Sequence, residues 1–133
     1  LNRIKKIRLF NRTIKNAQKL KNSIVSIHSF KDLKYFIERD SIIVNCTPIG
    51  MNDNKIPLNE KFINKDQIII DTIYNFKKTN LLDLGEQKGA FVINGLDMFV
   101  YQGIASLDLW LGENIFAKLN VEEIKQIMKE KLW

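Results

Sequence analysis

The sequence of 133 residues predicts an α/β fold in which a Rossmann-like parallel sheet is flanked by helices. Short β-branched runs alternate along the chain with stretches of helical periodicity, an order that joins parallel strands by right-handed crossovers. The strongest run, residues 67–71, reads Gln-Ile-Ile-Ile-Asp, and such continuous apolar runs are typical of strands buried on both faces of a parallel sheet. No internal repeat or linker divides the chain, so a single domain is expected.

Five strands are expected where short β-branched or aromatic runs are bounded by polar residues or glycine, at residues 7–10, 23–27, 42–45, 67–71 and 91–93. Residues 1–6 resemble the end of a helix. Further helices are expected at residues 14–20, 30–39, 81–88, 98–110 and 121–132.

Helix ends carry their own signals. Gly89 and Gly112 each follow a predicted helix, the position where a left-handed residue ends helices. Asn120, with Glu123 three residues later, forms a capping box before the last helix. One face of the helix that runs through Trp110 is traced by Met98, Tyr101, Gln102, Ala105 and Leu109.

Charge is unevenly distributed. Residues 1–40 hold eleven Lys and Arg against three acids, and residues 41–133 hold ten against twelve, which gives the net charge of +6. Solvated lysines explain this better than a nucleic-acid partner, because no zinc-finger set, RNA-binding aromatic motif or heptad accompanies them. No apolar stretch approaches the roughly 18 residues of a membrane span. One cysteine fits a reducing compartment, so a cytoplasmic protein is expected.

The loop after strand 7–10 decides cofactor type in a dinucleotide-binding fold. It holds Asn11, Arg12 and Thr13 and no acid. An Arg pairs with a phosphate through two hydrogen bonds, and a helix N-terminus favours an anion, so the pattern favours NADP over NAD. Taken alone, however, this tripeptide is more often an ordinary helix cap beside a surface Arg.

Three further stretches have two interpretations each. Thr47-Pro48-Ile49-Gly50 is either a plain tight turn or a loop whose backbone packs against a cofactor. Tyr74, after the strongest strand, either donates to a polyol or carboxylate or is a half-buried core aromatic. Gln102 is either a ligand contact or, as favoured on its own, a structural amide with satisfied hydrogen bonds.

The histidine and the cysteine of the sequence give little support for a catalytic or metal-binding site. His28 is the only histidine and has no neighbouring acid or serine, so no catalytic triad is expected. Cys46 is expected to be a small core residue rather than a nucleophile. One histidine and one cysteine do not suffice for a metal site.

Four motifs, taken in order, resemble the cofactor-binding half of shikimate dehydrogenases: NRT at 11–13, NCTPIGM at 45–51, DTIYN at 71–75 and NGLDMFVYQG at 94–103. The resemblance covers nearly the whole chain, and its order and spacing outweigh the single-motif interpretations of Arg12 and Gln102. It implies NADP-dependent interconversion of shikimate and 3-dehydroshikimate, a step of aromatic amino-acid (chorismate) biosynthesis.

The resemblance also implies residue roles. The 2′-phosphate and adenosine end of NADP would be held by Asn11, Arg12 and Thr13, with Lys15 and Asn16 close by. The nicotinamide side would be lined by Thr47, Thr72, Gly95 and Met98. The shikimate hydroxyls or carboxylate would contact Tyr74 and Gln102. The chain departs from the family at Asn16, where a second Arg is frequent, at Phe76, where Pro is common, and at Asp97, where a small residue is usual.

The family's catalytic Lys and Asp belong to an N-terminal substrate domain, and a Gly-rich phosphate loop follows the first strand of its cofactor domain. Neither is in this sequence, and Leu1 is not an initiator Met. Residues 1–133 are therefore expected to be a partial NADP-binding domain, truncated at the N-terminus, with no catalytic residue and no activity alone. The full-length protein is expected to be a homodimer.

Three alternatives remain open at this point. The first is a quinate/shikimate dehydrogenase. The second is another NADP oxidoreductase, such as a glutamyl-tRNA reductase. The third is a non-catalytic nucleotide-binding module.

Overall fold

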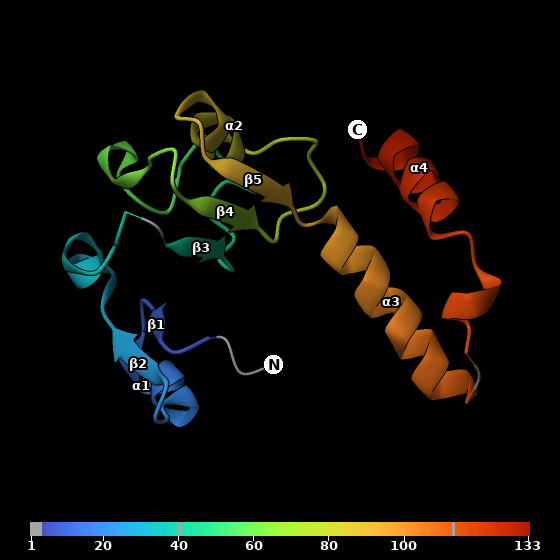
Figure 1. Ribbon diagram of the computed structural model, residues 1–133, viewed down its shortest axis with the longest axis horizontal. Coiled ribbons are helices and arrows are strands. Elements are labelled where there is room, and N and C mark those ends of the chain that lie inside the picture. The colour runs from blue at the N-terminus through green and yellow to red at the C-terminus, as the bar shows by residue number, and fades with distance from the viewer. Residues whose placement is uncertain (1–3, 40, 113) are drawn as a thin grey trace. The chain divides into compact units, whose positions relative to one another are not determined.

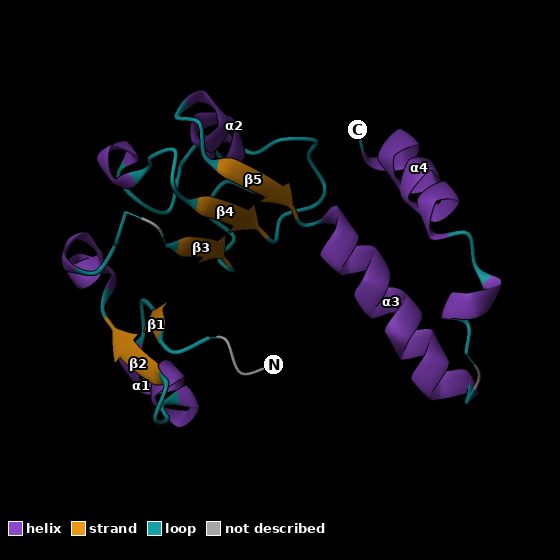
Figure 2. Ribbon diagram, viewed as in Figure 1, coloured by secondary structure: helices purple, strands orange, loops and turns teal. Residues whose placement is uncertain are grey.

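The computed structural model describes residues 4–39, 41–112 and 114–133. The chain divides into two compact units, Leu1–Glu38 and Arg39–Trp133, each with its own parallel sheet. Figure 1 labels the elements along the chain, and Figure 2 shows strands alternating with helices. Every strand pair is parallel, which confirms the predicted α/β, Rossmann-like class.

The first unit contains two strands joined by a helical crossover. Strand β1 (Ile7–Phe10) pairs with β2 (Val25–His28), so that Ile7 faces Val25 and Phe10 faces His28. Between them lie α1 (Ile14–Ala17), a single turn, and a 3₁₀ turn (Gln18–Leu20). A second 3₁₀ helix (Phe30–Tyr35) follows β2.

An aromatic cluster holds the first unit together. The rings of His28 and Phe36 have centroids 4.1 Å apart, and Phe10 lies 5.5 Å from His28. Arg8 donates from Nη1 to the Phe36 carbonyl at 2.8 Å and forms an ion pair with Glu38. The single histidine is therefore part of the packing of this unit.

The second unit is built on a sheet with the strand order β3 (Ile42–Asn45), β4 (Ile68–Asp71) and β5 (Phe91–Asn94). Helix α2 (Asn80–Gln87) connects β4 to β5 and packs on one face of the sheet (Figure 1). A Cβ on Gly85 would lie 2.9 Å from Ile69 and 3.0 Å from Val92, so the helix backbone approaches the strands directly. Ile69, beneath it, is fully buried.

The C-terminal part of the second unit is a helical pair. Helices α3 (Leu96–Leu111) and α4 (Val121–Leu132) are joined through a 3₁₀ turn (Phe116–Lys118). Gly112 ends α3 with φ +65°, and the Asn120 side chain accepts from the Glu123 amide, as the sequence predicts for both ends. Their shared core contains Leu96, Val100 and Ile104 from α3 and Val121, Ile124, Met128 and Leu132 from α4.

Some element predictions are wrong. Residues 4–6 are not helical, and residues 1–3 of that predicted helix end lie outside the described residues. Strand β2 begins at Val25 rather than at residue 23, because the Asn22 side chain accepts from the Ile24 and Val25 amides in a turn. The predicted helix at 30–39 is a shorter 3₁₀ helix. The 3₁₀ turns Glu60–Phe62 and Phe116–Lys118 were not predicted.

The face of α3 traced from the sequence is not the face that packs. Met98, Tyr101 and Leu109 are exposed, and the buried stripe is instead Leu96, Val100 and Ile104. Apolar residues surround most of this helix, so its sequence alone does not indicate which stripe packs. Among the described residues, no helix is long and apolar enough to cross a membrane.

Within the second sheet, Ile69 is buried and Ile42 is exposed, and this difference gives a testable prediction. Replacing fully buried Ile69 by Ala leaves a cavity beneath α2 and is expected to lower the free energy of unfolding by about 2–5 kcal/mol. Ile42→Ala, on the same sheet but 62% exposed, is the control and should cost less than about 0.5 kcal/mol. Urea unfolding followed by circular dichroism measures both, and equal losses would contradict the assignment of the core.

Candidate functional site

The carboxyl ends of β3 and β4 and the start of α2 meet around the buried carboxylate of Asp71. Its Oδ1 accepts from the Asn45 amide nitrogen at 3.1 Å and from the Ile73 backbone amide at 3.2 Å. Its Oδ2 accepts from the Thr79 hydroxyl at 2.7 Å, and the same hydroxyl caps α2 by accepting from the Leu82 amide. One carboxylate therefore fixes the ends of two strands and the start of a helix.

The loop that follows β3 depends on Asn45. Its Oδ1 accepts from the Thr47 amide at 3.0 Å and from the Thr47 hydroxyl at 2.7 Å, while its Nδ2 donates to the Ile49 carbonyl. Gly50 then adopts φ +94°, which side-chain-bearing residues rarely reach. The 47–50 stretch is thus a rigidly held turn whose Thr47 side chain is directed by the strand end.

Thr72 and Gly95 lie in close contact after the two following strands. Thr72 donates from its amide and its hydroxyl to the Asn45 carbonyl, at 3.1 and 3.0 Å. A Cβ on Gly95 would overlap the Thr72 carbonyl oxygen and lie 3.0 Å from that of Asp71. Gly95 caps α3, and Met98 follows in its first turn with its side chain half exposed. The four predicted nicotinamide-side residues therefore share one end of this sheet and the helix start beside it.

Tyr74 and Gln102 are both linked to Phe99 of α3. The rings of Tyr74 and Phe99 stack with centroids 4.1 Å apart and planes 17° apart. Gln102 donates from Nε2 to the Phe99 carbonyl at 3.0 Å, and the Trp133 indole donates to the Tyr74 carbonyl at 3.2 Å. Both predicted substrate residues thus contact Phe99, Tyr74 through the ring and Gln102 through the backbone carbonyl. Tyr74 is also partly buried against the α3–α4 core, which agrees with its interpretation as a half-buried core aromatic.

Lys125 ties α4 to the first turn of α3. Its ammonium group lies 3.0 Å from Glu122, 3.1 Å from Asp97 and 5.1 Å from the centre of the Tyr101 ring. The hydrogen bonds to Glu122 and then to Asp97 raise the pKa of Lys125, so it stays charged at neutral pH. Asp97, a departure from the resembled family, is therefore occupied in an ion pair that stabilises the helical pair.

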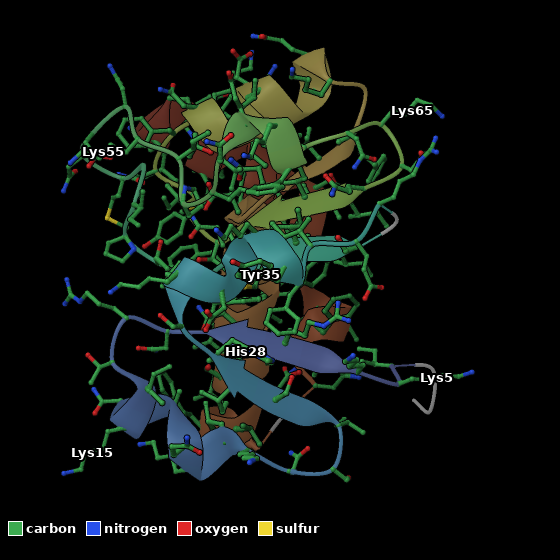
Figure 3. The ribbon with its side chains drawn as sticks, turned by 90° about the vertical axis from the view of Figure 1, so that its left-hand side faces the viewer. Lys5, Lys15, His28, Tyr35, Lys55 and Lys65 are labelled. Atoms are coloured by element: carbon green, nitrogen blue, oxygen red, sulfur yellow. The ribbon has the colours of Figure 1, made fainter. Side chains whose placement is uncertain are left out.

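The predicted 2′-phosphate residues belong to the first unit. Asn11 extends the strand pairing by donating to the His28 carbonyl, and its side chain accepts from the Thr13 amide at 2.8 Å. Arg12, Lys15 and Asn16 are exposed, and Lys15 extends away from the ribbon in Figure 3. Because α1 has only one turn, the helix dipole expected there contributes little. Any attraction for an anion comes from the two side-chain charges.

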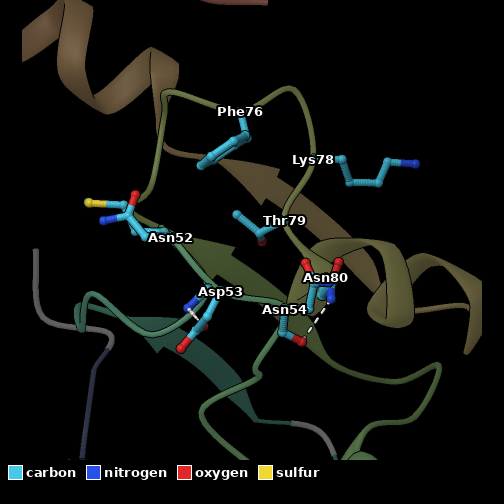
Figure 4. Close-up of a pocket in the computed structure, with 9 residues that line it drawn as sticks. Asn52, Asp53, Asn54, Phe76, Lys78, Thr79 and Asn80 are labelled. Carbon is cyan, nitrogen blue, oxygen red and sulfur yellow. Dashed lines mark hydrogen bonds between the residues drawn. The ribbon is translucent and has the colours of Figure 1, made fainter.

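A separate hollow of about 310 Å³ lies between the loops after β3 and β4 (Figure 4). Its lining combines polar side chains with one aromatic ring and comprises Gly50, Met51, Asn52, Asp53, Asn54, Phe76, Lys78, Thr79 and Asn80. Asn80 donates to the Asn54 carbonyl across it. The amides of Lys55 and Gly50 donate to Asp53 and lower its pKa. None of the predicted site residues lines this hollow.

Two further expectations can be compared with the structure. Cys46 was expected in the core but is exposed, because it lies in the turn that leaves β3. In the described part of the chain, no group of three or more His, Cys, Asp or Glu side chains is placed to hold a metal ion.

Sequence reasoning missed the roles of Asp71, Asn45, Thr79 and Lys125. The role of Asp71 could have been predicted, because an acid directly after Ile-Ile-Ile at a strand end is expected to be buried and to need hydrogen-bond donors. Nothing in the sequence pairs Lys125 with Asp97, because the contact depends on how α3 and α4 pack.

No family model matches the chain. Curated relatives do match, and they are named shikimate dehydrogenase (NADP(+)). The protein from Pyrococcus furiosus is 34% identical over 113 residues, which cover 85% of this chain and 42% of the relative. The one from Bacillus cereus (strain ATCC 10987) is 35% identical over 136 residues, covering 97% of this chain and 48% of the relative. The chain thus spans less than half the length of these relatives.

Solved structures agree with this likeness. A shikimate dehydrogenase crystallised in complex with NADP+ superposes with a TM-score of 0.77 at 30% identity, over 96% of this chain and 47% of that one. The similarity extends over both units of the chain, since it covers nearly all of its residues.

The close contact at Gly95 can be tested directly. Gly95→Ala places a methyl group against the Thr72 carbonyl and is expected to lower the free energy of unfolding by about 1–3 kcal/mol. Gly103→Ala, within the helix that Gly95 caps, is the control. A Cβ there meets no atom within 4 Å, so it should stabilise the protein by about 0.5–1 kcal/mol. Opposite signs in urea unfolding are expected, and a stabilising Gly95→Ala would disprove the contact.

Proposed function

We propose that this chain, which is similar over most of its length to part of the shikimate dehydrogenases, is the NADP-binding part of an enzyme that interconverts shikimate and 3-dehydroshikimate. The observation that carries the proposal is the gathering of Thr47, Thr72 and Gly95 at the carboxyl ends of three adjacent parallel strands. Ligands of open α/β sheets bind at that edge.

The phosphate end of the cofactor is assigned to the first unit. Arg12 and Lys15 are exposed cations, and no Asp or Glu precedes Asp32 in the sequence, so no acid in this stretch of the chain competes with a 2′-phosphate. Arg12 makes no hydrogen bond or ion pair within the described residues, which leaves its guanidinium available for a phosphate. Asn11, Thr13 and Asn16 supply neutral hydrogen-bonding groups beside it. These features fit NADP.

The nicotinamide end is assigned to the second unit. NADP, when bound, accepts or returns a hydride at its nicotinamide ring. Thr47 and Thr72 offer side chains fixed by Asn45, the bare Gly95 backbone allows close approach of a ring, and half-exposed Met98 gives an apolar surface. Because these groups are held before any ligand arrives, binding does not need to order them.

The substrate is assigned to Tyr74 and Gln102. Stacking on Phe99 fixes the Tyr74 ring, and the hydrogen bond from Gln102 Nε2 to the Phe99 carbonyl fixes its amide. In the described chain the Gln102 amide oxygen accepts no hydrogen bond, so it can accept one from a substrate hydroxyl. The Tyr74 hydroxyl can donate to a carboxylate or hydroxyl. A cyclitol acid offers both kinds of partner.

The assignment gives this chain positioning groups and no proton acceptor for the alcohol. Asp97, the nearest acid in sequence to Met98 and Gln102, is paired with Lys125. We therefore infer that residues 1–133 are a partial NADP-binding domain that binds cofactor without turnover. A cytoplasmic location and a homodimer of the full-length protein are further parts of the proposal, and sedimentation of that protein tests the second.

The activity test uses the full-length protein that carries this sequence. Nicotinamide absorbance at 340 nm is followed with NADP+ and shikimate, beside reactions with NAD+ and with quinate. Reduction chiefly with NADP+ and shikimate is expected. Turnover of quinate alone would remove the substrate assignment of Tyr74 and Gln102, and shikimate-dependent reduction by residues 1–133 alone would disprove the inferred lack of a catalytic base.

The phosphate assignment predicts a cofactor-selective loss of affinity. Arg12→Ala removes a charged hydrogen-bonding partner worth about 1.5–3 kcal/mol and should weaken NADP+ binding roughly ten- to hundredfold. NAD+ lacks the 2′-phosphate, so its affinity should not change. Isothermal titration of residues 1–133 with each cofactor measures the effect.

Arg39→Ala is the control for that measurement, because Arg39 is also an exposed arginine and pairs with Asp66 in the second unit. It should leave both affinities unchanged. An equal loss for NADP+ and NAD+ in Arg12→Ala, or the same loss in Arg39→Ala, would contradict the assignment.

A further inference from the structure

A single side chain, that of Asn94 at the end of β5, joins the segment after β4 to the start of α3. Its Nδ2 donates to the carbonyl of Phe76 at 2.9 Å and to that of Lys77 at 3.3 Å. Its Oδ1 accepts from the amide of Leu96, the first residue of α3, at 2.7 Å. The side-chain amide therefore uses its donor group on one segment and its acceptor group on the other.

The two segments that Asn94 joins carry the two proposed substrate residues. Tyr74 precedes Phe76 in the segment after β4, and Gln102 lies within α3. These segments come from different parts of the chain, so the placement of one substrate residue relative to the other depends on the bonds between them.

Few other bonds attach the segment that follows Tyr74. In the described part of the chain, backbone groups of residues 75–77 make no hydrogen bond other than the two with Asn94. Tyr74 itself is restrained by the Trp133 indole at its carbonyl and by the ring of Phe99. A ring stack fixes the spacing of two planes but not the direction of the backbone that follows. The course of this loop therefore depends on Asn94.

The acceptor half of the Asn94 amide serves the start of α3. The first amides of a helix have no partner within it, and Gly95, the N-cap residue, has no side chain that could accept from them. The Oδ1 of Asn94 accepts from one of these amides, that of Leu96. The direction in which α3 leaves the sheet, and with it the place of Gln102, therefore depends on the same side chain.

We propose that Asn94 is a positioning residue for the substrate, which fixes Tyr74 relative to Gln102 by tying the segment after β4 to the start of α3. It acts through these two residues and not by contact with the substrate. The inference rests on the proposed function, because it takes Tyr74 and Gln102 as the groups that bind the cyclitol acid. Binding groups have to be held to within about 0.5 Å, and hydrogen bonds from supporting residues provide that precision.

Asn94→Asp, made in the full-length protein that carries this sequence, separates the two halves of the link. A carboxylate keeps the acceptor for the Leu96 amide and loses the donor to the two carbonyls. Loss of two hydrogen bonds should raise the KM for shikimate roughly tenfold. The kcat should change less than about twofold, because Tyr74 and Gln102 are assigned binding and not proton transfer. The Kd for NADP+ should not change, which also shows that the variant folds.

Asn80→Asp is the matched control. Asn80 also donates from Nδ2 to the carbonyl of a distant segment, that of Asn54 at 2.8 Å, and the substitution brings the same charge into the same unit. This bond does not attach residues 74–77, so the KM for shikimate should not change. An equal rise of KM in both variants would assign the effect to the added charge and would overturn the proposal.

A second measurement does not depend on shikimate turnover. The rings of Tyr74 and Phe99 have centroids 4.1 Å apart, so their protons give a nuclear Overhauser effect in the NMR spectrum of residues 1–133. Asn94→Asp should weaken this signal because the segment after β4 is released, and Asn80→Asp should preserve it.

Two further results would overturn the proposal. One is an unchanged KM for shikimate in Asn94→Asp, and the other is an unchanged signal between the two rings. A full-length protein that oxidises no shikimate before any substitution would instead refute the proposed function. The ring signal would then still decide whether Asn94 positions Tyr74.

Discussion

The second unit depends on the hydrogen bonds that Asp71 accepts. A carboxylate removed from water is costly unless donors surround it, and Asp71, with no exposed surface, is reached by donors from β3, from its own loop and from the start of α2. Asn45, one of these donors, uses its own oxygen to hold Thr47. The polar network therefore fixes the strand ends, and the same bonds shape the loops proposed to meet the cofactor.

At these strand ends, the residues that stabilise the fold lie beside other residues that are proposed to bind the cofactor. Asp71, Asn45 and Thr79 turn their polar atoms inward and use them on one another. The side chain of Met98, by contrast, is half exposed beside the same strand ends. Thr72 is both a stabilising residue and a proposed cofactor contact. Its hydroxyl donates to the Asn45 carbonyl, and its own carbonyl contacts Gly95, which is also proposed to meet the cofactor. A change at Thr72 would therefore alter the fold and the proposed cofactor contact together.

Local chemistry explains which features the sequence predicts. The strands at 7–10, 42–45 and 67–71 follow from β-branched runs, and Gly112 and Asn120 end and begin helices through their own backbone or side chain. The buried stripe of α3 did not follow, because that helix is apolar on several sides and only α4 decides which side packs. The contact between Lys125 and Asp97 is likewise a result of packing. The site residues could be named from motif order, whereas their support by Asn45 and Phe99 required the structure.

The acid beside the proposed site is used for stability rather than for chemistry. The proposed reaction needs a proton acceptor, and the acid nearest to Met98 and Gln102 in sequence is already paired with Lys125. The apolar residues of α3 and α4 are likewise buried against each other. The contacts that hold the helical pair together therefore engage Asp97, so the proposal gives this chain the groups that position cofactor and substrate and no base.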